Sequence, residues 1–332
     1  MRWTAREVNR ALAWLVACGA GTGVLAFAIG TEPGGWVVVA HGILGLAVLV
    51  LAPLKARIAA RGIRRDRPGR ATSIVLSILA LVTVASGVAL TTGVVDRIGP
   101  LTSMQVHVGA GIGTAVVTAL HLRKRPAPRP TNPDRRRFLR VGALGAGAGV
   151  LWLGTEGVLA ATGAPGADRR FTGSHDRGSF DPGSMPGVQW LDDRPPDLDP
   201  ETWRVRVGDE DLDLATLTAL ADDTVEATLD CTGGWFATQS WRGVRLDRLV
   251  DPGEARSIVV RSATGYSRRL PVSDLDHLWL AVGYGDETLR RKHGFPARLV
   301  APGRRGFWWV KWVTAIEPSP APWWVQSPFP LT

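Results

Sequence analysis

The chain has 332 residues and is 45% hydrophobic, with 39 glycines and 23 prolines, so it is long enough for two domains and is neither disordered nor fibrous. Its two cysteines exclude a disulfide-stapled secreted module and any zinc or iron–sulfur site built from four cysteines. Residues 1–160 hold 19 Lys and Arg against 6 Asp and Glu (net +13), and residues 161–332 hold 20 against 24 (net −4). A basic apolar half beside a mildly acidic half is typical of a membrane protein and argues against a nucleic-acid partner.

Five apolar segments in the first half are each close to the roughly 20 residues that a helix needs to cross a bilayer. Seven Lys and Arg residues follow the second segment and eight follow the fourth, whereas the other two connections hold none and one. Because cytoplasmic loops are enriched in Lys and Arg, this alternation predicts a multi-pass protein of the cell (cytoplasmic) membrane with a cytoplasmic N-terminus and an extracytoplasmic second half. The sequence thus predicts a five-helix transmembrane bundle in residues 1–160, with helices at 11–30, 36–54, 72–95, 104–122 and 138–160.

A paired-arginine motif precedes the fifth segment. Residues 135–140 read Arg-Arg-Arg-Phe-Leu-Arg and are followed by Gly- and Ala-rich apolar sequence, which resembles a twin-arginine export signal, with Asp134 where Ser or Thr is usual. The alternative is a cluster of positive-inside charges that happens to contain paired arginines. Since twin-arginine export moves folded domains, the motif predicts that the twin-arginine translocase exports the second half with a cofactor already inserted.

Two histidines lie at similar depths in the predicted bundle, where ionisable side chains are costly and usually functional. His41 is about five residues inside the outer end of the second segment, and His107 is about four residues inside the outer end of the fourth. Imidazoles on neighbouring helices are the usual axial ligands of a b-type haem, and the glycines beside both residues would let a flat macrocycle approach. Lys55 stands where a second haem would need a partner for His121, so one haem b at most is expected. The alternative is hydrogen bonding between the helices.

The sequence of the second half predicts a Gly/Pro-rich linker at 161–187, followed by a mixed α+β, β-rich domain at 188–332. Short helices are expected at 212–222 and 244–250. Apolar stretches bounded by turn residues predict six strands, at Trp203–Val207, Val225–Leu229, Ser257–Val260, Leu278–Val282, Ala297–Val300 and Trp308–Ile316. This part of the sequence has no Gly-rich phosphate loop, no nucleophile elbow and no zinc-binding His-x-x-x-His helix.

Cys231 ends the second of these predicted strands and enters a Gly-rich turn. The other cysteine, Cys18, lies in the first membrane segment, which excludes a disulfide between them. A thiolate at such a junction is a suitable soft ligand for a metal, whereas the alternative is an inert buried thiol.

Three motifs, in this order, resemble the molybdopterin-binding domain of the sulfite oxidase family. They are Cys-Thr-Gly-Gly-Trp at 231–235 with Trp-Arg-Gly-Val at 241–244, His-Gly-Phe-Pro-Ala-Arg at 293–298, and Pro-Gly-Arg-Arg-Gly-Phe at 302–307 with Val-Lys-Trp at 310–312. The tail at 322–328 is similar to that of membrane-anchored bacterial members. The resemblance implies one molybdenum on a pyranopterin, with Cys231 as its protein ligand and catalytic residue.

The resemblance also implies residues that bind this cofactor. In related periplasmic reductases that repair methionine sulfoxide, the corresponding segments bind the pterin and its phosphate, which transfers to His293, Arg298, Val310 and Lys311. The chemistry is consistent with this, because a guanidinium and an ammonium both stabilise a buried phosphate. Ser262 is a further candidate pterin contact. Without the resemblance, these would be ordinary strand and turn residues.

The predicted function is a membrane-bound molybdenum oxidoreductase that transfers an oxygen atom with two electrons on the extracytoplasmic side. Electrons would pass to or from the quinone pool or an external carrier. One alternative is a sulfoxide or N-oxide reductase fed from the quinone pool, and another is a metal-free, membrane-anchored binding domain. The substrate is not predicted, because the candidate substrate-side cations His175, Arg177 and Arg242 are each better explained as structural or solvated residues.

Overall fold

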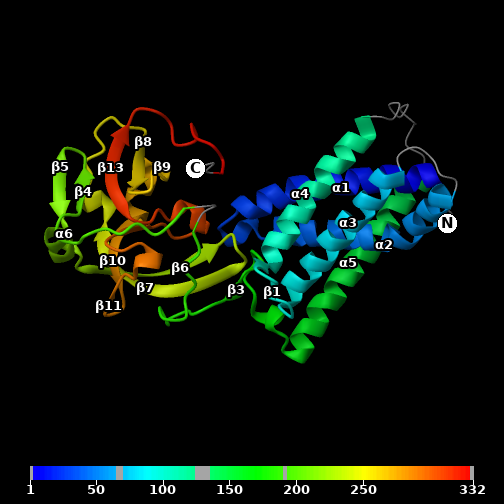
Figure 1. Ribbon diagram of the computed structural model, residues 1–332, viewed down its shortest axis with the longest axis horizontal. Coiled ribbons are helices and arrows are strands. Elements are labelled where there is room, and N and C mark those ends of the chain that lie inside the picture. Colours follow the sequence, from blue (N-terminus) through cyan, green and yellow to red (C-terminus); the bar gives the residue numbers. More distant parts are fainter. Residues whose placement is uncertain (1–2, 65–69, 124–134, 190–192, 330–332) are drawn as a thin grey trace. The chain divides into compact units, whose positions relative to one another are not determined.

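The computed structural model describes residues 3–64, 70–123, 135–189 and 193–329. The chain divides into two compact units, Met1–His175 and Asp176–Thr332, and the boundary falls inside the predicted linker. The first unit is helical and the second is built mainly from strands (Figure 1). The basic connections around 65–69 and 124–134, on which much of the charge alternation depends, lie outside the described residues.

Five long helices form the first unit, as predicted. Each is long and apolar enough to cross a membrane. Their bounds are α1 (Ala5–Ala28), α2 (Trp36–Arg64), α3 (Arg70–Thr92), α4 (Ser103–Arg123) and α5 (Arg135–Thr162). The second helix runs ten residues beyond the predicted end at 54, because Ala, Arg and Lys continue a helix after the apolar segment stops. Short strands β1 (Arg97–Ile98) and β2 (Leu101–Thr102) form a hairpin before α4.

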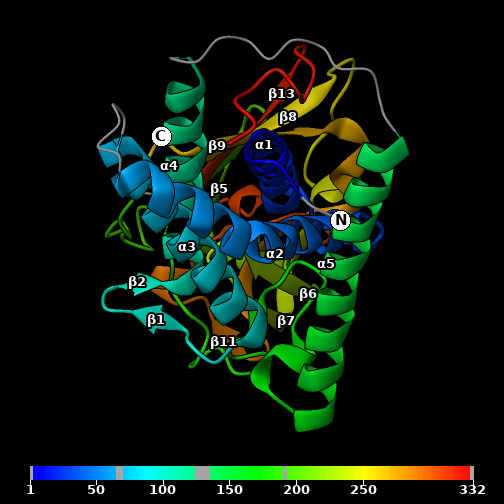
Figure 2. The same cartoon turned by 90° about the vertical axis from the view of Figure 1, so that its right-hand side faces the viewer.

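Four of these helices form a bundle in which α2 and α4 are diagonal. Both α2 and α4 pack along α1 and along α3, so the second and fourth helices face each other across the centre. The fifth helix packs along α2 (Figure 2). In this contact Trp152 covers Gly42. Large apolar side chains on the outer surface remain exposed, among them Trp14, Leu81 and Leu153, at 67%, 67% and 70%. A surface of this kind is suited to contact with lipid or another apolar partner.

Two sheets form the core of the second unit, which confirms the mixed α+β architecture. In one sheet, β11, β10 and β7 are neighbours in that order, while β12 also pairs with β10 and β6 also pairs with β7. The other sheet has the order β5-β4-β13-β8-β9, and in it β4 and β13 are parallel. The strand β3 (His175–Asp176) spans the boundary between the units. The remaining bounds are β4 (Arg204–Val207), β5 (Glu210–Asp213), α6 (Leu214–Leu220), β6 (Asp223–Cys231), β7 (Trp235–Arg245), β8 (Ser257–Ser262), β9 (Ser267–Pro271), β10 (Trp279–Tyr284), β11 (Glu287–Thr288), β12 (Arg298–Val300) and β13 (Val313–Ser319).

The structure adds a strand that was not predicted and corrects two of the predicted elements. The longest strand, β7, was not predicted, because its Gln, Ser, Gly and Arg residues lower its apparent strand propensity and its pairing with β6 supplies the stabilisation. The helix predicted at 244–250 is the end of β7 followed by a single 3₁₀ turn, Leu246–Arg248. The strand predicted at Trp308–Ile316 begins only at Val313, because the chain first makes a 3₁₀ turn at Gly306–Trp308.

Candidate functional site

Cys231 is the last residue of β6, at the turn of the β6–β7 hairpin. Its cross-strand partner is Trp235, and its Sγ accepts a hydrogen bond from the backbone N–H of Gly233 at 3.3 Å. Burial raises the pKa of the thiol, while the Gly233 N–H and the positive charges of Arg305 and Lys311 act in the opposite direction. A thiol beside two cations and a backbone donor can become a thiolate when a metal binds it.

A buried ion pair fixes the backbone on both sides of this thiol. Arg305 donates to the Asp230 carboxylate at 2.7 Å and to the carbonyl of Cys231 at 3.3 Å, and both side chains of the pair are at most 3% exposed. Residues 230 and 305 also form a parallel β-bridge, and Gly306 lies so close that a Cβ there would be 3.2 Å from the Cα of Cys231. The loop at 302–307 is thereby held against the hairpin that carries the thiol.

Arg298, at the start of β12, is a buried cation held between aromatic rings. It is 1% exposed, and its guanidinium lies 5.0 Å from the centre of the Trp241 ring and 5.5 Å from that of Trp309. It donates to the backbone carbonyls of His293 at 2.9 Å and Trp309 at 3.4 Å, whereas its Nε has no partner. Burial lowers the pKa of Arg298 to about 9.

Lys311 lies beside Arg298 and is half-buried. Its Nζ donates to the carbonyls of Val188 at 2.7 Å and Lys292 at 3.2 Å. Gly294 brings the two cations together: a Cβ at this position would lie 3.0 Å from Cβ of Arg298 and 3.2 Å from Cβ of Lys311, and its φ of 114° also favours glycine. Burial, together with the charge of Arg298, lowers the pKa of Lys311 to about 7.

This pKa predicts a pH dependence of stability in the cofactor-free protein. The unfolded chain holds the Lys311 proton up to about pH 10.5, whereas the folded protein releases it above about pH 7. The unfolded state therefore binds more protons in this window, and stability should rise with pH from 7 to 9. We expect Lys311→Met to reduce this slope, as measured by thermal unfolding of cofactor-free protein between pH 6 and 9. Equal slopes in the two proteins would contradict the assignment.

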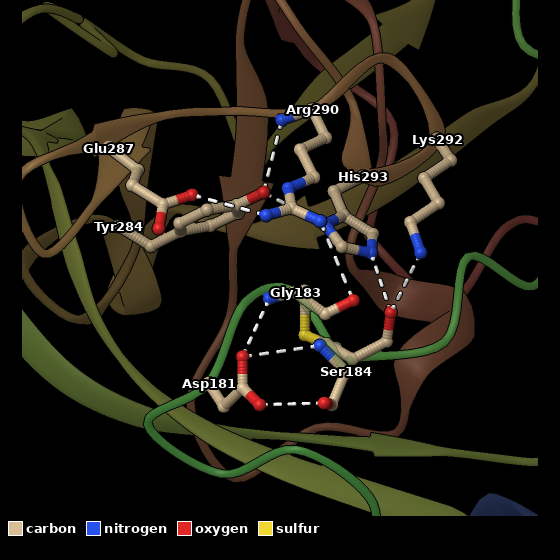
Figure 3. Close-up of polar contacts among 9 residues, drawn as sticks. Asp181, Gly183, Ser184, Tyr284, Glu287, Arg290, Lys292 and His293 are labelled. Carbon is tan, nitrogen blue, oxygen red and sulfur yellow. Dashed lines mark hydrogen bonds and ion pairs between the residues drawn. The ribbon is translucent and has the colours of Figure 1, made fainter.

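His293 uses both of its ring nitrogens within the protein. Nε2 donates to the carbonyl of Met185 at 3.0 Å, so Nδ1 accepts from the hydroxyl of Tyr284 at 2.9 Å, which itself accepts from the backbone N–H of Arg290 (Figure 3). Burial is the main cause that lowers the pKa of this imidazole, to about 3, which keeps it neutral. In this arrangement, the His293 ring fixes the segment around Met185, and its backbone carbonyl orients Arg298.

The other two residues predicted to contact the pterin, Ser262 and Val310, form hydrogen bonds within the protein. Ser262 ends β8, and its hydroxyl bonds to the hydroxyl of Thr264 at 3.0 Å and accepts from the Thr264 backbone N–H at 3.2 Å. Val310 is buried, and its carbonyl accepts from the backbone N–H of Leu299 at 2.7 Å. In the helical unit, His41 and His107 approach each other within hydrogen-bonding range.

Several residues of the site were missed as separate candidates in the sequence. Arg305 lies inside the motif at 302–307 and Asp230 directly precedes the motif at 231–235, but nothing in their spacing of 75 residues indicates an ion pair. The same holds for Trp241 and Trp309, whose rings flank Arg298. An open basic pocket lined by Pro195, Arg290, Arg291 and Lys292 lies next to His293 in the chain.

The chemistry of these residues fits an anionic metal cofactor. Within the described parts of the chain, neither Arg298 nor Lys311 forms an ion pair with a carboxylate, and the thiolate charge of Cys231 would raise the pKa of both. Buried N–H groups without a partner remain on Arg298, Arg305 and Trp235. Buried cations and donors of this kind are stabilised when an anion binds, and the thiol supplies a soft ligand for the metal.

Comparisons with known proteins find similarity to molybdopterin-binding proteins. Residues 193–324 match the family described as the oxidoreductase molybdopterin binding domain. The mitochondrial sulfite oxidase of Drosophila melanogaster is 28% identical over 159 residues, which cover 36% of this chain and 28% of that protein. The chain therefore spans less than a third of the length of this relative. The crystal structure of the sulfane dehydrogenase SoxCD from Paracoccus pantotrophus is 25% identical, covering 38% of this chain and 40% of that one, with a TM-score of 0.35.

The second unit thus defines the chain as an oxidoreductase enzyme that carries a molybdopterin-binding domain. Within the second unit, the match to the mitochondrial sulfite oxidase makes this domain similar to that protein in sequence.

Proposed function

We propose that the protein is a membrane-anchored molybdenum enzyme that carries out two-electron oxo-transfer on the extracytoplasmic side. One observation carries this proposal: in the matched domain, a single thiol lies within electrostatic range of the buried Arg298 and the half-buried Lys311, and neither cation forms an ion pair with a carboxylate in the described structure. Such a place suits a cofactor that combines a thiolate-bound metal with an anionic organic part.

Each residue has a distinct part in this proposal. Cys231 would bind the molybdenum, while Arg298 and Lys311 would bind the phosphate of the pterin. The Asp230–Arg305 pair would hold the thiol at a fixed position, and His293 would position Arg298. Ser262, at the end of β8, and Val310, in the segment before β13, would contact the pterin. When bound, the cofactor supplies two-electron oxo-transfer chemistry, and the protein supplies its binding and orientation.

The helical unit would anchor this enzyme in the cytoplasmic membrane. Five helices of sufficient length and the exposed apolar side chains on their surface support this. We place the N-terminus in the cytoplasm and the second unit outside, from the charge alternation of the sequence. Electrons would then be exchanged with the quinone pool or with an external carrier, and the twin-arginine translocase would export the folded second unit.

The proposal is tested by metal analysis of the purified full-length protein. Produced in a host that makes the cofactor, it should contain about one molybdenum per chain; produced in a host that lacks cofactor synthesis, it should contain none and show no turnover. Absence of molybdenum from the first preparation would favour a metal-free binding domain instead. The direction of the reaction is tested separately, with sulfite and an electron acceptor and with a sulfoxide and an electron donor.

We expect the double change Arg135→Lys, Arg136→Lys to block export of the second unit but not insertion of the first four helices. Lysine preserves the charge that sets topology, whereas the translocase receptor requires the arginine pair. The measurement is the location of a C-terminal reporter. The matched control is Arg57→Lys, Arg61→Lys in the last turns of α2, which should leave the reporter outside. If the reporter is also exported from the 135/136 variant, these arginines are only a charge cluster.

A further inference from the structure

Two histidines meet in the centre of the helical unit. His41 lies on α2 and His107 on α4, and their Nε2 atoms are 3.5 Å apart. The ring centres are 5.8 Å apart and the ring planes are nearly perpendicular, at 89°. Since α2 and α4 are diagonal in the bundle, the two imidazoles meet across its centre, and not between adjacent helices as the sequence suggested.

The backbone fixes which nitrogen of each ring carries the proton. Nδ1 of His41 lies 3.0 Å from the carbonyl oxygen of Gly19, and Nδ1 of His107 lies 2.8 Å from that of Thr83. Nδ1 of His41 also lies 3.1 Å from the hydroxyl of Thr22, which itself donates to the carbonyl of Cys18 at 2.8 Å and so can accept from the ring. Since carbonyl oxygens can only accept, each Nδ1 is a donor. In the neutral imidazoles, both Nε2 atoms are therefore acceptors, and two lone pairs face each other with no hydrogen between them. This arrangement is unfavourable unless a cation lies between the two nitrogens. Histidines that bind metals are oriented in the same way, by an N–H donated to a backbone carbonyl.

The distance between the two nitrogens suits one metal ion. A bond between a metal and an imidazole nitrogen is about 2.0 Å long, so two nitrogens on opposite sides of one metal are about 4 Å apart. The observed separation of 3.5 Å requires only a small outward movement of the rings. Within the described residues, no group of three or more His, Cys, Asp or Glu side chains could hold a metal. A metal here would have two protein ligands, and an iron porphyrin supplies the other four itself.

Glycines on α1 and α3 leave room for the two imidazole rings. A Cβ at Gly23 of α1 would lie 3.2 Å from Cε1 of His41, and a Cβ at Gly87 of α3 would lie 3.0 Å from Cε1 of His107. Both histidines are half-buried, so an edge of the site is open to a flat ligand. The glycines that contact the imidazoles are thus on the partner helices, whereas Gly42, next to His41 in sequence, is covered by Trp152.

We propose that His41 and His107 are the two axial ligands of one haem in the core of the helical unit. This site goes beyond the proposed function, because it does not depend on molybdenum in the second unit. The competing arrangement is a proton shared between the two rings, which would place a positive charge among apolar helices without a metal.

The test is spectroscopic and uses the full-length protein, purified from a haem-replete host. The dithionite-reduced minus oxidised spectrum of the wild type should show a low-spin b-type α band, with about one haem per chain by pyridine haemochrome. His41→Ala and His107→Ala should each lose the low-spin band. The affinity of each variant for added haemin should be at least tenfold lower than that of the wild type. His121→Ala, on the same helix as His107, is the matched control and should keep both.

A second pair of variants separates loss of the ligand from loss of the fold. His41→Met and His107→Met retain an axial ligand that haem accepts, so they should bind haem with a shifted spectrum and reduction potential. No haem in the wild type under haem-replete conditions, or an unchanged band in both alanine variants, would overturn the proposal in favour of the shared proton. Molybdenum content is measured on the same samples and should be unchanged in all variants, so a failure of this site is distinguishable from a failure of the proposed enzyme.

Discussion

Replacing Cys231 with Ser should abolish turnover, by at least a thousandfold, in a protein that remains folded. Among the described residues, the Sγ atom accepts one weak hydrogen bond, from the Gly233 backbone, so a smaller oxygen that accepts the same bond does not disturb the hairpin. An alkoxide is a harder and far more basic ligand than a thiolate, however, and molybdenum would be bound differently or lost. The measurements are molybdenum per chain and turnover with sulfite and with a sulfoxide.

The matched control for this change is Cys18→Ser. Cys18 is exposed on α1 in the helical unit, whereas Cys231 lies at the candidate metal site. The control should keep its molybdenum and its turnover. Unchanged turnover in the Cys231 variant would show that the thiol is not the metal ligand, and equal losses in both variants would show that cysteine replacement damages the protein in general.

Removing one partner of the Asp230–Arg305 pair should have the largest effect on stability. Both side chains are at most 3% exposed, so Arg305→Ala leaves a carboxylate buried without its counter-charge. Breaking a buried pair in this way costs about 3 to 5 kcal/mol. We expect a loss of this size in the free energy of unfolding of the second unit, measured by denaturant titration of the full-length protein, together with loss of molybdenum, because the same guanidinium also bonds to the Cys231 carbonyl.

An exposed pair on the same domain provides the comparison. Arg248 and Asp222 are 2.6 Å apart, but their side chains are 41% and 63% exposed. Arg248→Ala should therefore cost far less stability than Arg305→Ala, because solvent screens an exposed pair, and should leave the molybdenum in place. The double change Asp230→Asn, Arg305→Met removes both buried charges and should recover part of the stability without restoring turnover. If Arg305→Ala cost no more than Arg248→Ala, the buried pair would not be what holds the thiol.

Local patterns in the sequence were sufficient for part of this architecture. The five helices of the first unit were predicted within a few residues at most ends, because about 20 consecutive apolar residues form a signal that needs no partner. The motifs around Cys231, Arg298 and Lys311 also located the cofactor-binding domain before its fold was known, since residues that bind one ligand type tend to keep fixed local spacings. The β-rich second unit followed from short apolar stretches between turns.

The tertiary structure alone decided how these parts meet. The sequence placed His41 and His107 at one depth, but only helix packing shows that α2 and α4 are diagonal and that carbonyls of α1 and α3 fix the tautomers. The ion pair of Asp230 and Arg305 likewise depends on a contact between residues 75 apart. Hydropathy and local propensity report a segment's own environment and conformation. Pairings between distant segments arise instead from the packing of whole helices and sheets, which no local pattern encodes.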